Sequence, residues 1–170
     1  FAIVRGVYSA EEVALVRQIT DQLMDDPALN QKRHRPEGFI LRNTLSLHPI
    51  FLELMMRQPV LSLAEAVLGE GCRFVGQNVI RNPPGRAIAT WHVDDTLEFP
   101  LPPEIPRFDP RLIMPVHWLT IQMALSDLTS EEDGPTQFVP GSHYSGRRPS
   151  NQEAPLFDGQ GPVSILCRAG

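Results

Sequence analysis

The hydrophobic positions near the start of the chain repeat with the period of a helix. Their spacing of three to four residues predicts one apolar stripe, formed by Leu15, Val16, Ile19 and Leu23. Ser9 and Glu12 have the spacing of a capping box, which predicts that the helix begins just after Ser9. The acidic pair before Pro27 is expected to end this helix.

A second helical region is predicted after Pro49, over residues 51–55. Pro59 is expected to break or kink it, because proline lacks a backbone N–H and its ring clashes with the preceding turn. A further apolar run over residues 61–68 is followed by Gly69. Glycine readily adopts the backbone conformation that follows a helix, so this run is expected to end there.

From residue 73 onward the pattern changes to the period of two that marks strands. Strands are predicted over five ranges, namely 74–81, 88–94, 116–125, 136–139 and 163–167. His117 shares one face of its strand with Leu119 and Ile121, which predicts a histidine packed in the core or in an interface. Helices followed by closely spaced strands favour an α+β or mainly β fold, and 170 residues fit a single domain.

The composition is that of an ordinary globular protein, with 42% hydrophobic residues and a net charge of −5. This mild negative charge gives no electrostatic reason to expect nucleic acid or an anionic membrane as a partner. The basic cluster at residues 32–35 is expected to be a solvated loop. Cys72 and Cys167 are isolated, which favours a reducing compartment such as the cytoplasm. Nothing in the sequence indicates an oligomeric state.

His92 and Asp94 form the most informative chemical feature of the chain. In an extended strand, residues i and i+2 point to the same side, so the imidazole and the carboxylate are expected to project together. Two such groups fill two corners of the two-histidine, one-carboxylate face that holds non-haem Fe(II). The spacing alone is a weak signal, because many sequences contain a His-x-Asp triplet by chance.

The segment that follows Asp94 is rich in proline. Residues 96–115 contain six of the 17 prolines of the chain. A connection of this length is either a stiff surface crossing or a lid over a site, and the sequence leaves both interpretations open. Because the segment leaves directly from Asp94, it is the element expected to face a substrate.

Four stretches of the chain together resemble the phytanoyl-CoA dioxygenase family of Fe(II)/2-oxoglutarate-dependent oxygenases. They are residues 1–13, the Trp-His-Val-Asp-Asp motif at 91–95, the strand ending in Ala-Leu-Ser-Asp at 119–127, and the Gly-Pro…Pro-Gly-Ser-His segment at 134–143. The stretches follow one another in the order found in the family. The His-x-Asp motif is weak alone, but in combination with the fourth stretch it becomes a specific signature.

The resemblance implies a double-stranded β-helix, also called a jelly roll or cupin-like core, with N-terminal helices packed on one sheet. It also implies a reaction in which O₂ and 2-oxoglutarate become succinate and CO₂ while a small-molecule substrate is hydroxylated. His92 and Asp94 would be the catalytic ligands of Fe(II). Halogenating relatives have a small residue in place of the carboxylate, so Asp94 favours hydroxylation.

The family has a third metal ligand, a histidine on a later strand, followed by an arginine that pairs with 2-oxoglutarate. The last residues, 163–170, resemble the strand and turn that come just before that histidine. The resemblance therefore implies that residues 1–170 are a C-terminally incomplete domain, with the third ligand and the arginine beyond Gly170. Such a fragment is expected to bind iron weakly or not at all.

His143 is the alternative third ligand, with Arg147 or Arg148 as the residue that pairs with 2-oxoglutarate. The preceding Pro-Gly-Ser sequence is typical of a turn, so a structural loop histidine is the favoured interpretation. Two alternatives to an oxygenase also remain open. One is a cupin-like metal enzyme with further His or Glu ligands, and the other is a β-helix domain without catalytic activity.

Gln77 and Gln122 are the candidate contacts for 2-oxoglutarate. Some relatives place a glutamine at the position of Gln77, and an amide at Gln122 could hydrogen-bond a carboxylate. An ordinary polar role in the barrel is an equally good interpretation of each glutamine. Trp91 and Trp118 are expected to be core residues.

Overall fold

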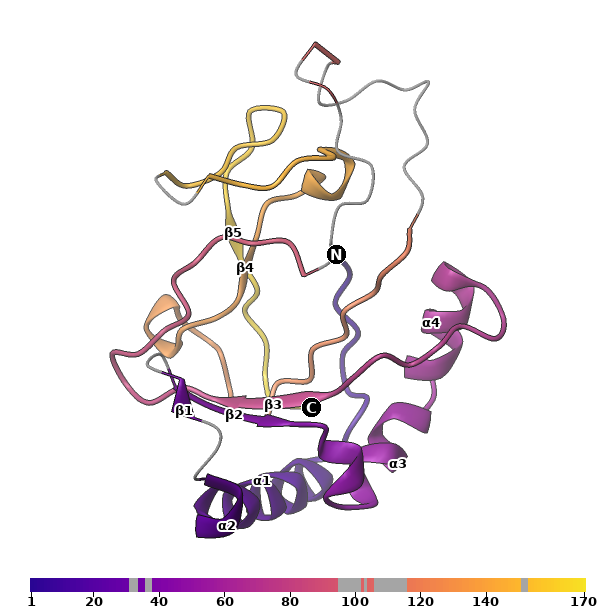
Figure 1. Ribbon diagram of the computed structural model, residues 1–170, viewed down its shortest axis with the longest axis vertical. Coiled ribbons are helices and arrows are strands. Elements are labelled where there is room, and N and C mark those ends of the chain that lie inside the picture. Colours follow the sequence, from indigo (N-terminus) through magenta and orange to yellow (C-terminus); the bar gives the residue numbers. More distant parts are fainter. Residues whose placement is uncertain (31–33, 36–37, 95–101, 103, 106–115, 151–152) are drawn as a thin grey trace. The chain divides into compact units, whose positions relative to one another are not determined.

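The computed structural model describes residues 1–30, 34–35, 38–94, 102, 104–105, 116–150 and 153–170. The described residues form four α-helices and five strands, and Figure 1 labels these elements along the chain. The helices are α1 (Ala10–Asp25), α2 (Pro27–Asn30), α3 (Ile50–Met56) and α4 (Val60–Leu68). The strands are β1 (His34–Arg35), β2 (Gly38–Arg42), β3 (Asn78–Arg81), β4 (Gln137–Phe138) and β5 (Val163–Ser164).

The chain divides into two compact units, which are described separately. The helical unit comprises Val4–Ile88, Met123–Asp127 and Arg168–Gly170, and contains α1–α4 and β1–β3. The β4–β5 unit comprises Phe1–Ile3, Ala89–Gln122 and Leu128–Cys167. None of the helices in the described part of the chain is both long and apolar enough to cross a membrane.

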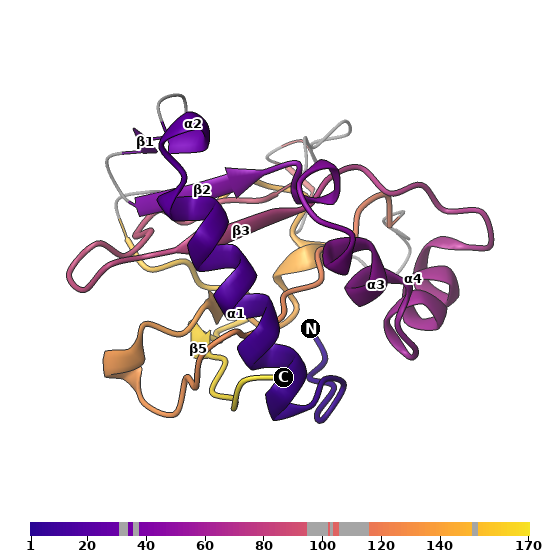
Figure 2. The same ribbon diagram turned by 90° about the horizontal axis from the view of Figure 1, so that it is seen from below.

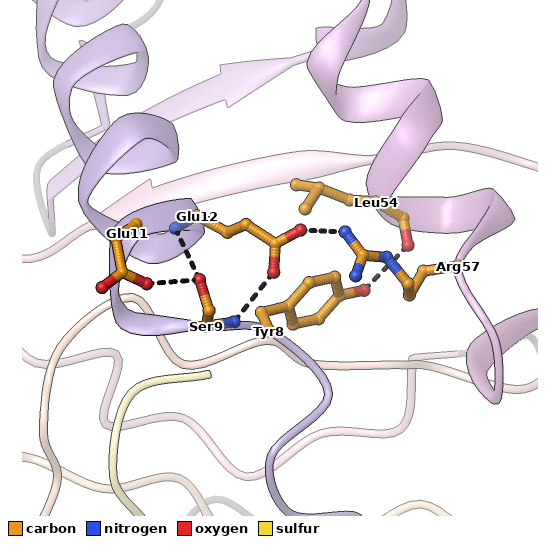
Figure 3. A network of polar contacts seen from close by, with 6 residues as sticks. All are labelled: Tyr8, Ser9, Glu11, Glu12, Leu54 and Arg57. Carbon is orange, nitrogen blue, oxygen red and sulfur yellow. Dashed lines mark hydrogen bonds and ion pairs between the residues drawn. The ribbon is translucent and has the colours of Figure 1, made fainter.

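The capping box that the sequence predicts is present at the start of α1. The Ser9 side chain accepts a hydrogen bond from the Glu12 backbone N–H at 3.3 Å, and the Glu12 carboxylate accepts one from the Ser9 N–H at 2.8 Å (Figure 3). These bonds satisfy N–H groups that have no partner within the helix. The predicted end is also confirmed, because Asp26 is the C-cap and Pro27 begins α2.

The buried face of α1 differs from the predicted stripe. Its buried residues are Val13, Val16, Thr20 and Met24. Ile19 and Leu23 are half-buried against the core, as expected, but Leu15 is 48% exposed and its predicted burial is wrong. The polar Thr20 lies in the middle of the true stripe, so a pattern based on hydrophobicity alone places the buried face too far toward Leu15.

The predicted helices after Pro49 and Pro59 are confirmed as α3 and α4. Gly69 ends α4 with φ +90°, and its N–H donates to the Glu65 carbonyl at 2.8 Å. The core of the helical unit is built on Val16 of α1 with Phe51 and Leu54 of α3. The partly buried residues packed against it are Tyr8, Ile19, Leu23, Leu45, Ile50, Val79, Met123 and Leu125.

A three-stranded antiparallel sheet with the order β1-β2-β3 completes the helical unit. Its register places Leu41 opposite Val79 and Ile40 opposite Ile80. Leu41 is buried and Val79 contacts the core, whereas Ile80 is 49% exposed, so one face of the sheet is buried. Figure 2 shows α1 running across this sheet, and α1 contacts β2.

Two of these strands were not predicted from the sequence. His34–Arg35, part of the basic cluster expected to be a solvated loop, forms β1, while Lys32 and Arg33 lie outside the described residues. The prediction of a loop is therefore wrong for His34 and Arg35. A strand of two residues is defined by its partner, here β2, and not by a pattern of its own.

The backbone of Gly170 lies between two other segments of the helical unit. Its N–H donates to the Ala124 carbonyl at 3.0 Å, and its carbonyl accepts from the N–H groups of Val7 and Tyr8, each at 3.1 Å. Gly170 has φ +85°, and a Cβ there would lie 2.5 Å from the Tyr8 carbonyl oxygen. Both observations require glycine at this position.

The β4–β5 unit contains less regular structure than the sequence predicts. The strands expected over 136–139 and 163–167 are present as the short antiparallel pair β4 and β5, and an isolated bridge joins Leu128 and Cys167. Residues 88–94 and 116–125, most of which belong to this unit, are fully described but form no strand, so these two predictions are wrong. Alternation predicts where side chains point, whereas a strand also needs a hydrogen-bonded neighbour.

The two small sheets do not form a closed barrel within the described residues. The double-stranded β-helix and the single-domain organisation that the sequence suggests therefore stay predictions.

Candidate metal centre

The side chains of His92 and Asp94 lie next to each other in the β4–β5 unit. His92 Nε2 is 3.3 Å from Asp94 Oδ1. The spacing of two residues predicts this proximity, although the segment that carries the pair is not a strand. The two side chains are 58% and 47% exposed, so an ion in solution can reach both.

A backbone contact determines which nitrogen of His92 is available. His92 Nδ1 lies 2.8 Å from the Thr90 carbonyl oxygen. A carbonyl oxygen can only accept a hydrogen bond, so Nδ1 carries the proton. In the neutral imidazole the lone pair is then on Nε2, the atom that faces Asp94.

This arrangement fits a cation. A lone pair on Nε2 and a carboxylate oxygen at 3.3 Å repel each other unless a proton or a metal ion lies between them. Adjacent ligand atoms of an octahedral ion with bonds of about 2.1 Å lie about 3 Å apart, close to the observed separation. Imidazole nitrogen and carboxylate oxygen are also donors that suit Fe(II). The role of the pair as metal ligands stays a prediction.

Two residues that the sequence did not single out as part of the site complete a chain of hydrogen bonds to Asp94. The Thr120 hydroxyl donates to Asp94 Oδ2 at 2.8 Å, and the Trp118 indole N–H donates to the Thr120 hydroxyl oxygen at 3.1 Å. Trp118 and Thr120 are two residues apart, the spacing that puts them on one face in the predicted strand. That spacing was the available signal, but it does not identify Asp94 as the partner.

The described residues bring no third His, Cys, Asp or Glu side chain to the pair. No group of three or more His, Cys, Asp or Glu residues that could hold a metal ion occurs among them. His143 lies in the short 3-10 helix η3 (Ser142–Tyr144), where its ring is 4.0 Å from that of Tyr144. Partial burial lowers the pKa of His143. The third ligand predicted beyond Gly170 stays a prediction.

Arg147, the alternative partner for 2-oxoglutarate, contacts backbone carbonyls in the β4–β5 unit, and its pairing with 2-oxoglutarate stays a prediction. Its guanidinium donates to the carbonyls of Pro102 at 3.1 Å and Ile105 at 2.9 Å. Pro102, Glu104 and Ile105 are the only described residues of the segment 96–115, so the choice between a surface crossing and a lid lies outside the described residues. Arg148 is exposed.

Gln77 has local partners in the helical unit. Its side-chain oxygen accepts a hydrogen bond from the Thr44 hydroxyl at 2.6 Å, and its side-chain nitrogen donates to the Phe51 carbonyl at 3.5 Å. The Thr44 N–H also donates to the Gln77 backbone carbonyl at 3.4 Å. These contacts connect the residue just before β3 to the 3-10 helix η1 (Thr44–Ser46) and to α3. A contact of Gln77 with 2-oxoglutarate stays a prediction.

The side chains around Gln122 are more exposed than expected. Gln122 is exposed, and its contact with 2-oxoglutarate stays a prediction. His117 is exposed, so a position in the core is wrong, whereas a position in an interface stays a prediction. Trp118 is 40% exposed, so its prediction as a core residue is wrong. Trp91 is half-buried. The expected packing depended on a strand over residues 116–125 with a covered face, and that strand is absent.

Comparisons with known proteins agree with the motifs. The family model for phytanoyl-CoA dioxygenase (PhyH) matches residues 1–170 and confirms the predicted resemblance. The ectoine dioxygenase of Stutzerimonas stutzeri (strain A1501) is 23% identical over 158 residues, which cover 84% of this chain and 46% of that protein. The chain therefore spans about half the length of this curated relative. No solved structure matches the chain.

Proposed function

The chain belongs to the phytanoyl-CoA dioxygenase family, and on this basis we propose that it is the metal-binding part of an Fe(II)- and 2-oxoglutarate-dependent oxygenase. The proposed reaction hydroxylates a small molecule and converts 2-oxoglutarate to succinate and CO₂. The double-stranded β-helix is proposed as the fold of the complete domain. The observation that carries the proposal is the position of His92 Nε2 beside Asp94 Oδ1.

His92 and Asp94 would hold the iron through Nε2 and Oδ1. When bound, Fe(II) supplies the redox chemistry that couples decarboxylation of 2-oxoglutarate to oxidation of a substrate C–H bond. The contribution of the protein is to present the two donors in the correct form. The Thr90 carbonyl keeps the proton of the imidazole on Nδ1, so that Nε2 is free to bind the metal.

The carboxylate of Asp94 also bears on the outcome of the reaction. A carboxylate occupies a position that must be empty for a halide to bind, so the residue supports hydroxylation over halogenation. A small molecule is proposed as the substrate because the relative is named an ectoine dioxygenase. At 23% identity over part of that protein, the name supports the type of reaction but does not identify the substrate of this chain.

The test is succinate release by the full-length protein with Fe(II), 2-oxoglutarate and O₂. Asp94→Ala is expected to abolish succinate formation, because the metal loses a charged ligand. Glu153→Ala is the matched control, since Glu153 is an exposed carboxylate in the same unit. This control is expected to release succinate at the wild-type rate.

Folding is checked in parallel by circular dichroism and thermal unfolding. Asp94 is 47% exposed, so its replacement is expected to leave the unfolding temperature almost unchanged. Wild-type rates of succinate release in a folded Asp94→Ala protein would remove Asp94 from the chemistry and overturn the proposal.

A further inference from the structure

We propose that Thr120 is a positioning residue for the metal centre, supported by Trp118, and that it fixes which oxygen of Asp94 binds the metal. This inference rests on the proposed function, since it concerns the same pair of ligands. It goes further by assigning a role to two residues outside the His-x-Asp motif. The β4–β5 unit contains all four residues of this arrangement, namely His92, Asp94, Trp118 and Thr120.

The hydrogen bonds have a defined direction. A threonine hydroxyl has one proton to donate, and Asp94 is the acceptor at 2.8 Å. The hydroxyl oxygen keeps its lone pairs, and one of them accepts the Trp118 indole N–H at 3.1 Å. An indole N–H can only donate, so it orients the threonine hydroxyl with its proton toward the carboxylate. The two bonds in series polarise each other and strengthen the contact with Asp94.

The two carboxylate oxygens of Asp94 therefore have different partners. Oδ2 accepts from Thr120, while Oδ1 faces His92 Nε2 at 3.3 Å. Rotation of the carboxylate about its last bond would break the bond to Thr120. Thr120 thus favours binding of the metal through Oδ1 alone. A carboxylate that binds through both oxygens would occupy a further coordination position, which 2-oxoglutarate and O₂ need.

The exposure of these side chains argues against a role of the contact in stabilising the fold. Thr120 is exposed, Trp118 is 40% exposed and Asp94 is 47% exposed. Hydrogen bonds between exposed side chains contribute little to the free energy of unfolding, because water replaces them when they are lost. A change at Thr120 is therefore expected to alter metal binding without altering stability, and this separation makes the role testable.

The experiment measures Mn(II) binding to the full-length protein by calorimetry, with Mn(II) as a probe that does not oxidise during the titration. Thr120→Val removes the hydroxyl and keeps the shape of the side chain. It is expected to raise the dissociation constant of Mn(II) about 10- to 100-fold, the usual effect of losing a partner of a metal ligand. Thr120→Ser keeps the hydroxyl and is expected to stay within about 3-fold of the wild-type value.

Trp118→Phe provides an independent variant of the same contact. It keeps the aromatic ring and removes the indole N–H, so it is expected to raise the Mn(II) dissociation constant by less than Thr120→Val. Asp94→Ala and His92→Ala are the reference variants, because each removes a proposed ligand. The unfolding temperature of each variant is measured in the same buffer, and the Thr120 variants are expected to match the wild type.

The outcomes separate the inference from the proposed function. Loss of Mn(II) binding in Asp94→Ala together with wild-type affinity in Thr120→Val would overturn the role of Thr120 and leave the metal centre in place. Equal weakening in Thr120→Val and Thr120→Ser would also overturn it, because the hydroxyl would not be the cause. Wild-type Mn(II) affinity in both Asp94→Ala and His92→Ala would instead reject the proposed function.

Discussion

The Asp127 carboxylate accepts a hydrogen bond from the backbone N–H of Ala169 at 2.9 Å, across 42 residues of sequence. The neighbouring N–H of Gly170 donates to the Ala124 carbonyl at 3.0 Å. The first and last residues of the Ala-Leu-Ser-Asp motif at 124–127 thus both accept hydrogen bonds from the backbone of residues 169–170. The motif that contributes to the family resemblance has a structural role in the helical unit.

Replacing Asp127 by alanine is expected to lower the free energy of unfolding by about 1 kcal/mol. A hydrogen bond to a charged acceptor is worth more than this when buried, but Asp127 is exposed and water compensates in part. Asp127→Asn keeps an acceptor oxygen, so its free energy of unfolding is expected to fall by less than that of Asp127→Ala. Urea unfolding of the two variants measures the difference, and equal stability of Asp127→Ala and the wild type would contradict the assignment.

A side chain at Gly141, in the Pro-Gly-Ser-His segment, is expected to destabilise the protein. Gly141 has φ +75°, and a Cβ there would lie 3.0 Å from the ring of the buried Phe157. Gly141→Ala is expected to lower the free energy of unfolding by about 2 kcal/mol or more, through backbone strain and the contact with the ring.

Gly159→Ala is the matched control for this prediction. Gly159 also has φ +75°, but apart from its chain neighbours no atom of the described residues lies within 4 Å of a Cβ placed there, so Gly159→Ala introduces the backbone strain alone. Thermal unfolding of both variants separates the two contributions. A loss in Gly141→Ala no larger than that in Gly159→Ala would mean that the Phe157 ring moves aside at no cost.

Thr20 offers a stabilising substitution. Its hydroxyl oxygen is buried in α1 and has no hydrogen-bond partner among the described residues. Thr20→Val replaces this hydroxyl by a methyl group and is expected to raise the free energy of unfolding by about 1 kcal/mol. Thr20→Ser keeps the hydroxyl, loses the methyl group and is expected to destabilise. A less stable Thr20→Val protein in urea unfolding would indicate that the hydroxyl has a partner after all.

Glu12 makes the stability of the helical unit depend on pH. Its hydrogen bond with the Ser9 N–H, followed by that with Arg57, holds the pKa of Glu12 below its ordinary value of 4.5 (Figure 3). A pKa lowered by folding contributes stability that is complete above the ordinary value. This contribution is lost as the pH falls through the lowered pKa of the folded state.

The difference in stability between the wild type and Glu12→Gln is therefore expected to be constant from pH 7 to about pH 5 and to shrink below pH 4.5. Thermal unfolding across this range measures it. Glu53→Gln, at an exposed carboxylate on α3, is measured in the same buffers as a control for the loss of one carboxylate. A difference that grows as the pH falls would contradict the sign of the pKa shift.

Local sequence signals predicted several elements correctly because their causes lie within a few residues. The capping box at Ser9 and Glu12, the break at Pro59 and the end of α4 at Gly69 each depend on contacts inside one turn. The proximity of His92 and Asp94 has the same origin, since two residues of spacing suffice to bring the side chains together. The family resemblance likewise rested on short motifs in a fixed order.

The amino-acid sequence by itself thus predicted the helices α1, α3 and α4, though not the short helix α2, and it identified the pair of candidate ligands and the family. The tertiary structure decided what depends on distant partners. It paired β2 with β3, turned Leu15 of α1 outward, and brought Thr120 to Asp94 across 26 residues. The physical reason is that a repeating pattern sets the direction of a side chain, whereas the group it meets depends on the folding of segments far along the chain.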